Sequence, residues 1–233
     1  TEEDIARDFA GKEVGKYGDI FTPFWEEEPV MMKPAPSGGA NWPPSSYSPD
    51  TEYFYVLGTD QYTSFQRSDQ EYEPEMIKEG TYYIGSIIQA GLEAPIRGTL
   101  TAMDVKTNKI AWQVPWDSMP YSGILTTKGN LLFTGHSDGR LMAFDAKTGK
   151  QVWEFTTDAG VNAPPITYEV DGKQYISVFV AGNSLAGSKH GDSLWTFSLE
   201  GTIDSVEDLP EQDAKTDTNE EEKNSVKDQD RAR

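Results

Sequence analysis

A short segment of this chain occurs twice, and the repeat limits the folds that the chain can adopt. The stretch from Gly98 to Trp112 returns from Gly139 to Trp153, at an offset of 41 residues. A period of about 41 residues is the length of one four-stranded blade of a β-propeller. Each copy reads as an apolar strand, a polar turn and a second strand that carries the Trp. The repeat therefore predicts successive propeller blades.

A third, incomplete copy of the segment begins at Asp192. Its Leu194 and Phe197 take the places of Leu141 and Phe144 in the second copy. The polar turn and the final Trp do not follow, and terminal repeats of an array are commonly atypical. This copy is expected to belong to a closing blade.

Composition excludes several classes of partner and site. The net charge of −19 argues against nucleic acid and anionic membranes, which both bind cationic surfaces. Cysteine is absent, which rules out disulfides, a thiolate metal site and a covalent haem attachment within these 233 residues. There is no apolar run of about 18 residues, so no membrane span is expected. The chain begins with Thr1 and shows no signal-peptide pattern, so we expect a processed or trimmed product.

Three regions follow from the distribution of proline, charge and apolar residues. Residues 1–37 are rich in proline and are expected to be an extended segment that wraps over a surface, with a short helix near Glu2–Phe9. Residues 38–203 hold the blades. Residues 204–233 are acidic and almost devoid of apolar side chains, which is typical of a disordered tail.

The middle region is predicted to be all-β, with mostly antiparallel strands. Strand signals, rich in aromatic and β-branched residues, cover 53–57, 124–134 and 175–180. Residues 61–80 are polar, show no strand period and are interpreted as an excursion between strands. No long helical period occurs within 40–203.

Three blocks of sequence together resemble a known family. They are the Gly-Gly-x-Asn-Trp-x-Pro block at 38–44, the two Ala-x-Asp-x-x-Thr-x-Lys-x-x-Trp turns, and the block from Ala159 to Tyr175. Their order and spacing resemble the C-terminal half of the pyrroloquinoline-quinone (PQQ) dependent alcohol dehydrogenases. The resemblance extends from about Gly38 to Leu199 and implies an eight-bladed propeller, of which this chain would form about four blades as an open arc.

The resemblance also implies cofactor contacts. The Asn of the Gly-Gly-x-Asn-Trp block is a quinone contact in the family, so Asn41 is a candidate, with Trp42 beside it. An amide has donors and an acceptor for the carbonyl and carboxylate edges of a flat anionic ring. The alternative roles are a turn cap for Asn41 and packing for Trp42. Asn183 and Ser184 lie where the family places a loop against the cofactor, although the glycine-rich pattern with a Trp is missing here, and an ordinary turn is the alternative.

Other conspicuous residues are assigned structural roles. Trp112 and Trp153 recur once per repeat and are expected to be buried between blades. Asp104 and Asp145 are expected to hold their own turns through side-chain to backbone bonds. His136 and His190 lack ligand partners at metal spacing, so a surface or turn role is expected.

The implied function is part of a PQQ-dependent dehydrogenase that oxidises an alcohol or polyol in the periplasm or outside the cell. The catalytic carboxylate and the calcium ligands of the family belong to its N-terminal half, so this chain has no assigned catalytic or metal-binding residue and is expected to be inactive alone. Its expected partners are that N-terminal half or a companion chain, a small alcohol and an electron acceptor such as a cytochrome. The alternatives are a non-catalytic propeller scaffold that binds proteins and, with less support, a sugar-binding propeller.

Overall fold

A computed structural model describes residues 5–7, 13–18, 22–23, 28–69, 73–74, 83–90 and 97–209. These residues contain no α-helix, and none of their helices could cross a membrane. The chain divides into two compact units, Thr1–Thr202 and Ile203–Arg233. Among the described residues of the second unit, Val206–Asp208 forms a short 3-10 helix, η4.

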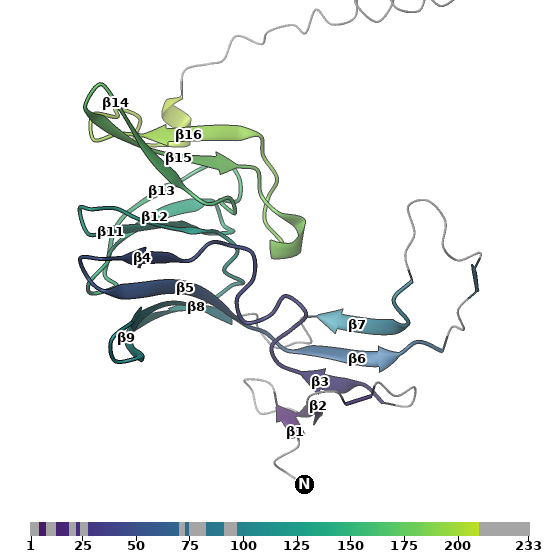
Figure 1. The fold of residues 1–233 in the computed structure, drawn as a ribbon. Coiled ribbons are helices and arrows are strands. Elements are labelled where there is room, and N and C mark those ends of the chain that lie inside the picture. The colour runs from purple at the N-terminus through teal and green to yellow at the C-terminus, as the bar shows by residue number, and fades with distance from the viewer. Residues whose placement is uncertain are drawn as a thin grey trace, which may run out of the picture. The chain divides into compact units, whose positions relative to one another are not determined.

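The first unit consists of short strands that form four sheets (Figure 1). The first seven strands are β1 (Ile5–Arg7), β2 (Glu13–Tyr17), β3 (Val30–Met32), β4 (Ser46–Ser48), β5 (Tyr53–Asp60), β6 (Thr63–Arg67) and β7 (Ser86–Ala90). They are followed by β8 (Arg97–Asp104), β9 (Lys109–Trp116), β10 (Ile124–Thr126), β11 (Leu131–Gly135) and β12 (Arg140–Asp145). The last are β13 (Gln151–Thr156), β14 (Ile166–Val170), β15 (Lys173–Val180) and β16 (Ser193–Phe197), with the 3-10 helix η3 (Ser184–Ala186) between β15 and β16.

Three of the sheets are antiparallel blades whose strands follow chain order, except that β6 and β7, between β5 and β8, belong to the fourth sheet. Blade 1 has the order β4-β5-β8-β9, blade 2 the order β10-β11-β12-β13 and blade 3 the order β14-β15-β16. The fourth, here called the side sheet, has the order β1-β2-β3-β6-β7 and contains one parallel pair, β2 with β3. The prediction of an all-β protein built from antiparallel blades is confirmed.

The sequence repeat corresponds to a structural repeat. Its two copies form the hairpins β8–β9 and β12–β13, the third and fourth strands of blades 1 and 2. Each hairpin has a register shift at the same repeat position, after Ala102 in one and after Ala143 in the other. The incomplete third copy forms β16, the third strand of blade 3, as its alignment with β12 predicts.

An aspartate closes the turn of each hairpin. Asp145 Oδ1 accepts hydrogen bonds from the backbone nitrogens of Lys147 and Thr148, at 3.1 and 2.8 Å, and from Thr148 Oγ1 at 2.8 Å. Asp104 Oδ1 accepts the two equivalent backbone bonds. These bonds lower the pKa of both carboxyl groups. The predicted structural role of both aspartates is confirmed.

Each repeat Trp packs against the next blade, but neither is fully buried. The Trp112 indole donates to the carbonyl of Ala146 at 3.0 Å, and its ring lies directly over Gly149 of the blade 2 turn. Trp153 packs against Phe197 of blade 3, with ring centroids 5.4 Å apart. Trp153 is still 38% exposed, because β16 is not followed by a turn like that of blade 2. The inter-blade role is therefore confirmed, and the prediction of complete burial is wrong.

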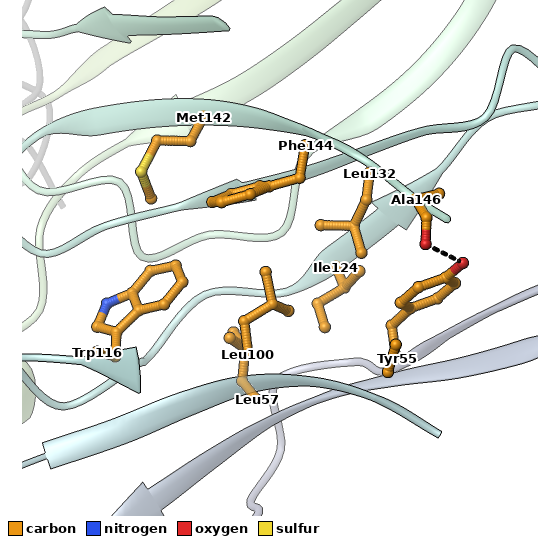
Figure 2. Packing of buried hydrophobic residues seen from close by; sticks show 10 residues of the cluster. Tyr55, Leu57, Leu100, Trp116, Ile124, Leu132, Met142, Phe144 and Ala146 are labelled. Atoms are coloured by element: carbon orange, nitrogen blue, oxygen red, sulfur yellow. Dashed lines mark hydrogen bonds between the residues drawn. The ribbon is translucent and has the colours of Figure 1, made fainter. Parts of the chain in front are cut away.

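The main core lies between blades 1 and 2 (Figure 2). Blade 1 contributes the buried side chains of Tyr55, Leu57, Leu100, Ala102 and Trp116, and blade 2 those of Ile124, Leu132, Met142, Phe144 and Ala146. The Tyr55 hydroxyl donates to the Ala146 carbonyl at 2.9 Å, so that carbonyl accepts bonds from two blade 1 side chains. Burial raises the pKa of Tyr55.

A second core lies between blades 2 and 3. Its buried members are Leu141, Ala159, Val161, Ile176, Val178 and Val180. Leu141 points into this core while the next residue of β12, Met142, points into the first, as the alternation of a strand requires. Blade 2 is therefore covered on both faces.

The structure differs from three expectations about the other regions. The helix expected near Glu2–Phe9 is wrong for the described residues, because Ile5–Arg7 is a strand. Within 1–37, Val30 and Met31 are buried in the side sheet, although a surface segment was expected. Residues 63–67 form β6, although no strand was expected within 61–80. Of the predicted disordered tail, 204–233, residues 204–209 are described and include η4, and the rest lies outside the described residues.

We predict that Tyr55→Phe and Trp112→Phe act non-additively on the free energy of unfolding. Each single change leaves the Ala146 carbonyl one donor and should cost about 1 kcal/mol. The double variant leaves a buried carbonyl without these donors, so it should lose about 1 kcal/mol more than the sum. Denaturant unfolding measures this, with Tyr47→Phe as a control at a half-exposed ring. Additive losses would contradict the shared-acceptor role.

The aspartate turns predict a pH dependence of stability. The pKa of Asp145 is lowered from 3.8 on folding, so its contribution exists above that value and is lost as the pH falls through the folded-state pKa. Wild type should therefore exceed Asp145→Asn in unfolding free energy at neutral pH, and the difference should shrink in acid below the ordinary value. A difference that stays constant from neutral to acid pH would show that the carboxylate charge is unimportant.

Candidate functional site

The candidate cofactor residues lie at the same end of the blades. In each blade, one end carries two connections: the one that enters the first strand and the one that joins the second strand to the third. This end is here called the loop end. Apart from the long connection between β5 and β8, the segments at this end are 36–45, 117–123, 136–139, 157–165 and 181–192. Asn41 and Trp42 belong to the first of these segments, and Asn183 and Ser184 to the last. The aspartate turns lie at the opposite end, as the path of the strands in Figure 1 shows.

Three of these segments meet at Gly123. A methyl group placed on Gly123 would lie 2.5 Å from Cβ of Pro164 and 2.8 Å from Cγ of Pro44. The next residue, Ile124, donates its backbone N–H to the Pro44 carbonyl at 2.9 Å. The entry segments of the three blades are thus in direct contact, and a residue with a side chain at position 123 would separate them.

Asn41 caps a local turn through both ends of its amide. Its Nδ2 donates to the Ser37 carbonyl at 2.5 Å, and its Oδ1 accepts from the backbone nitrogen of Trp42 at 2.7 Å. The turn-capping alternative of the sequence analysis is therefore what the geometry shows. The side chain is exposed, and an amide has a second hydrogen and a second lone pair, so capacity for a ligand remains.

Trp42 presents an aromatic surface at the loop end. It is 51% exposed, and its ring stands edge-on to Tyr121 with centroids 5.4 Å apart. Its indole N–H has no hydrogen-bond partner among the described residues. Trp42 is thus partly a packing residue and partly a free donor with an open ring surface.

Asn183 and Ser184 belong to a structured loop. The Asn183 Oδ1 caps η3 by accepting from the backbone nitrogen of Leu185 at 2.8 Å. Ser184 Oγ is 3.0 Å from Nε2 of His190. Among the described residues, the Asn183 Nδ2 group has no acceptor, so it is a second free donor at this end. The turn role that was the alternative for Asn183 is present.

A buried amide that sequence reasoning did not single out connects these segments. Asn162 is 4% exposed, and its Nδ2 donates to the Tyr121 carbonyl at 3.3 Å and to Ser137 Oγ at 3.2 Å. Its Oδ1 accepts from Ser188 Oγ at 2.6 Å. Asn162 lies within the 159–175 block that carries the family resemblance, so its position was visible but its contacts were not.

His136 also lies at this end and is more buried than a surface role implies. It is 8% exposed and stacks on Trp116 with ring centroids 5.2 Å apart. Its Nδ1 is 2.8 Å from the Asp138 carboxylate, and its Nε2 is 3.0 Å from Ser118 Oγ. Burial opposes ionisation of Asp138, but bonds from Arg140 and the nearby His136 lower its pKa overall. Of the two expected roles, surface or turn, the structure shows a turn role for His136, in a buried position.

The donor set suits a flat anionic group better than a metal ion. The free donors of Trp42 and Asn183 are uncharged N–H groups, Trp42 adds an open aromatic ring, and Ser37 Oγ is buried without a hydrogen-bond partner among the described residues. These groups can bond to the carbonyl and carboxylate edges of a planar ring. No group of three His, Cys, Asp or Glu side chains that could hold a metal occurs in the described parts of the chain.

Comparison with known proteins places the chain in a family. Residues 3–176 match the family model described as glucose/ethanol/alcohol dehydrogenase, beta-propeller domain, with the short name PQQ. Quinoprotein alcohol dehydrogenase PedE of Pseudomonas putida is 39% identical over 186 residues, which cover 74% of this chain and 28% of that protein. The 1-butanol dehydrogenase (quinone) of Thauera butanivorans is 35% identical, over 74% of this chain and 29% of that protein.

Solved structures agree with this match. The quinohemoprotein alcohol dehydrogenase ADHIIG of Pseudomonas putida HK5 has a TM-score of 0.71 and 27% identity, over 90% of this chain and 34% of that one. The enzyme from Comamonas testosteroni has a TM-score of 0.66 and 29% identity, over 86% of this chain and 31% of that one. The chain spans about 28% of the length of PedE. By the family match, the shared residues and the shared blades, this chain belongs to the PQQ-dependent quinoprotein alcohol dehydrogenases.

Proposed function

We propose that this chain forms one wall of the quinone pocket of a PQQ-dependent dehydrogenase that oxidises an alcohol or polyol. The observation that carries the proposal is the unbroken contact path at the loop end. Trp42 touches Tyr121, the Tyr121 carbonyl bonds to Asn162, Asn162 bonds to Ser188, and Ser188 bonds to the backbone of Asn183. The path joins the two segments that the family resemblance assigns to the cofactor.

Each candidate residue has a distinct role in this proposal. Trp42 offers its open ring face and its indole N–H, and Asn183 offers its free Nδ2. Asn41 fixes the 37–42 turn and contributes its remaining hydrogen and lone pair, and Ser184 offers a hydroxyl held by His190. When bound, the quinone accepts the two electrons of alcohol oxidation. This chain's residues bind it and orient it.

The rest of the reaction is proposed to depend on groups outside this chain. The general base that takes the hydroxyl proton and the calcium ligands are expected in the part of the enzyme that the longer relatives contain. A cytochrome is a reasonable electron acceptor, because relatives include quinohemoproteins and a 1-butanol dehydrogenase (cytochrome c). A periplasmic or extracellular location belongs to the same proposal. No specific observation favours the scaffold or the sugar-binding alternative.

The chain alone should show no alcohol-dependent dye reduction when PQQ and calcium are added. Neither a base nor a metal cage has been assigned to its described residues, so the hydroxyl proton has no acceptor. Co-expression with the N-terminal part of the enzyme should restore turnover, measured with an artificial electron acceptor. Robust turnover by the 233-residue chain alone would contradict the proposal.

In the complete enzyme, Asn41→Ala should weaken PQQ binding by about 1–3 kcal/mol, because a polar partner and the turn that presents Trp42 are both lost. Absorbance titration with PQQ measures the affinity. Asn108→Gly is the matched control, since it removes an exposed amide at the opposite end of the blade. Asn108 has φ of 54°, and Gly149 occupies the equivalent repeat position with φ of 73°. Equal PQQ affinities of Asn41→Ala and Asn108→Gly would show that Asn41 does not contribute to the pocket.

A further inference from the structure

We propose that Asn162 is a positioning residue that fixes the Asn183 loop relative to the Trp42 platform, and thereby sets the affinity for the quinone. This inference rests on the proposed function. Asn162 does not reach the open surface, because only 4% of it is exposed. It acts through the segments 117–123, 136–139 and 181–192, to each of which it makes a hydrogen bond.

The bonds of Asn162 require an amide in one orientation. Two of its partners accept or can accept a hydrogen, namely the Tyr121 carbonyl and Ser137 Oγ. The third, Ser188 Oγ, donates to Oδ1. Only Asn and Gln carry a donor group and an acceptor on the same terminal carbon, and Gln would be too long for the space that Asn fills. An aspartate has the same shape but loses both donated bonds.

Close packing at Gly160 fixes the position of Asn162. A methyl group on Gly160 would lie 2.5 Å from Cβ of Ser188 and 2.8 Å from Oδ1 of Asn162. Gly160 also donates its N–H to the Lys189 carbonyl and accepts from Gly182, each at 2.9 Å. The backbone at 160–162 and the loop at 182–189 therefore approach as closely as glycine permits.

The contact path through Asn162 ends at Trp42 on one side and at Asn183 on the other, the two residues whose free groups are proposed to contact the quinone. On one side, Asn162 holds the backbone of Tyr121, and the Tyr121 ring supports the edge of Trp42. On the other side, it holds Ser188, whose Oγ accepts the backbone N–H of Asn183 at 2.7 Å. Loss of Asn162 would break the side-chain path between Trp42 and Asn183 and leave only the contacts at Gly160 and Gly123 to hold their segments. Pre-organised positions of binding groups reduce the ordering cost of binding.

Three variants of the complete enzyme separate this role from general stability. Asn162→Asp keeps the acceptor for Ser188 but removes the donations to Tyr121 and Ser137. Ser188→Ala breaks only the branch toward Asn183. Ser177→Ala is the matched control, because Ser177 is also 4% exposed and bonds to Thr196 and Tyr168 within blade 3.

Hydrogen exchange tests the coupling without the cofactor. Asn162→Asp should raise amide exchange in 117–123, where the bond to Tyr121 is lost, and Ser188→Ala should raise it in 181–192 alone. Ser177→Ala should change neither segment. Unchanged exchange at 117–123 in Asn162→Asp, or at 181–192 in Ser188→Ala, would overturn the positioning role.

Absorbance titration with PQQ tests the functional consequence. Asn162→Asp should weaken PQQ binding by about tenfold or more, as expected for lost buried hydrogen bonds, and Ser177→Ala should stay close to wild type. Equal affinities of Asn162→Asp and Ser177→Ala would overturn the inference while leaving the proposed function intact. Wild-type enzyme that binds no PQQ would overturn the proposed function itself, and the two failures are therefore distinct.

Discussion

Each blade of this protein depends on a neighbour that covers its apolar face. Blade 2 carries apolar side chains on both faces, and it buries one face against blade 1 and the other against blade 3. Polar contacts also join neighbouring blades, because Trp112 and Tyr55 of blade 1 both donate to the Ala146 carbonyl of blade 2. Stability is thus a property of pairs of blades.

The outer face of blade 3 shows the consequence of an uncovered sheet. Phe179 and Leu194 are a cross-strand pair there, and they are 50% and 67% exposed. Leu141, the repeat equivalent of Leu194, is fully buried. The same residue type at the same repeat position thus differs in burial according to its neighbours. This agrees with the proposal that a larger part of the enzyme completes the ring, since contiguous apolar patches of this kind mark interaction surfaces.

The sequence was sufficient for features that depend on local pattern. The 41-residue repeat located the hairpins, and the aspartates were recognised as turn residues because their bonds join positions two and three residues apart. Features that depend on distant contacts were missed. Neither the burial of His136 nor the role of Asn162 has a local signal, because their partners are up to 20 and 41 residues away. The strand at 63–67 was missed because its partners, β3 and β7, lie on both sides of it in sequence, and its polar composition shows no period.

The Trp112 ring packs on Gly149, in the aspartate turn of the next blade. Because of this contact, the turn end of a blade and the loop end differ in how well they tolerate inserted residues. The tryptophan meets a turn that lies one repeat further along the chain, so an inserted residue in that turn would displace the glycine from beneath the ring. The loop end is held by different contacts, at Gly123, Gly160 and Asn162, and the chain carries its longest excursion from this end, between β5 and β8. Added length is therefore accommodated where the chain leaves the blades, as β6 and β7 do between β5 and β8, while the stacking of blades stays fixed.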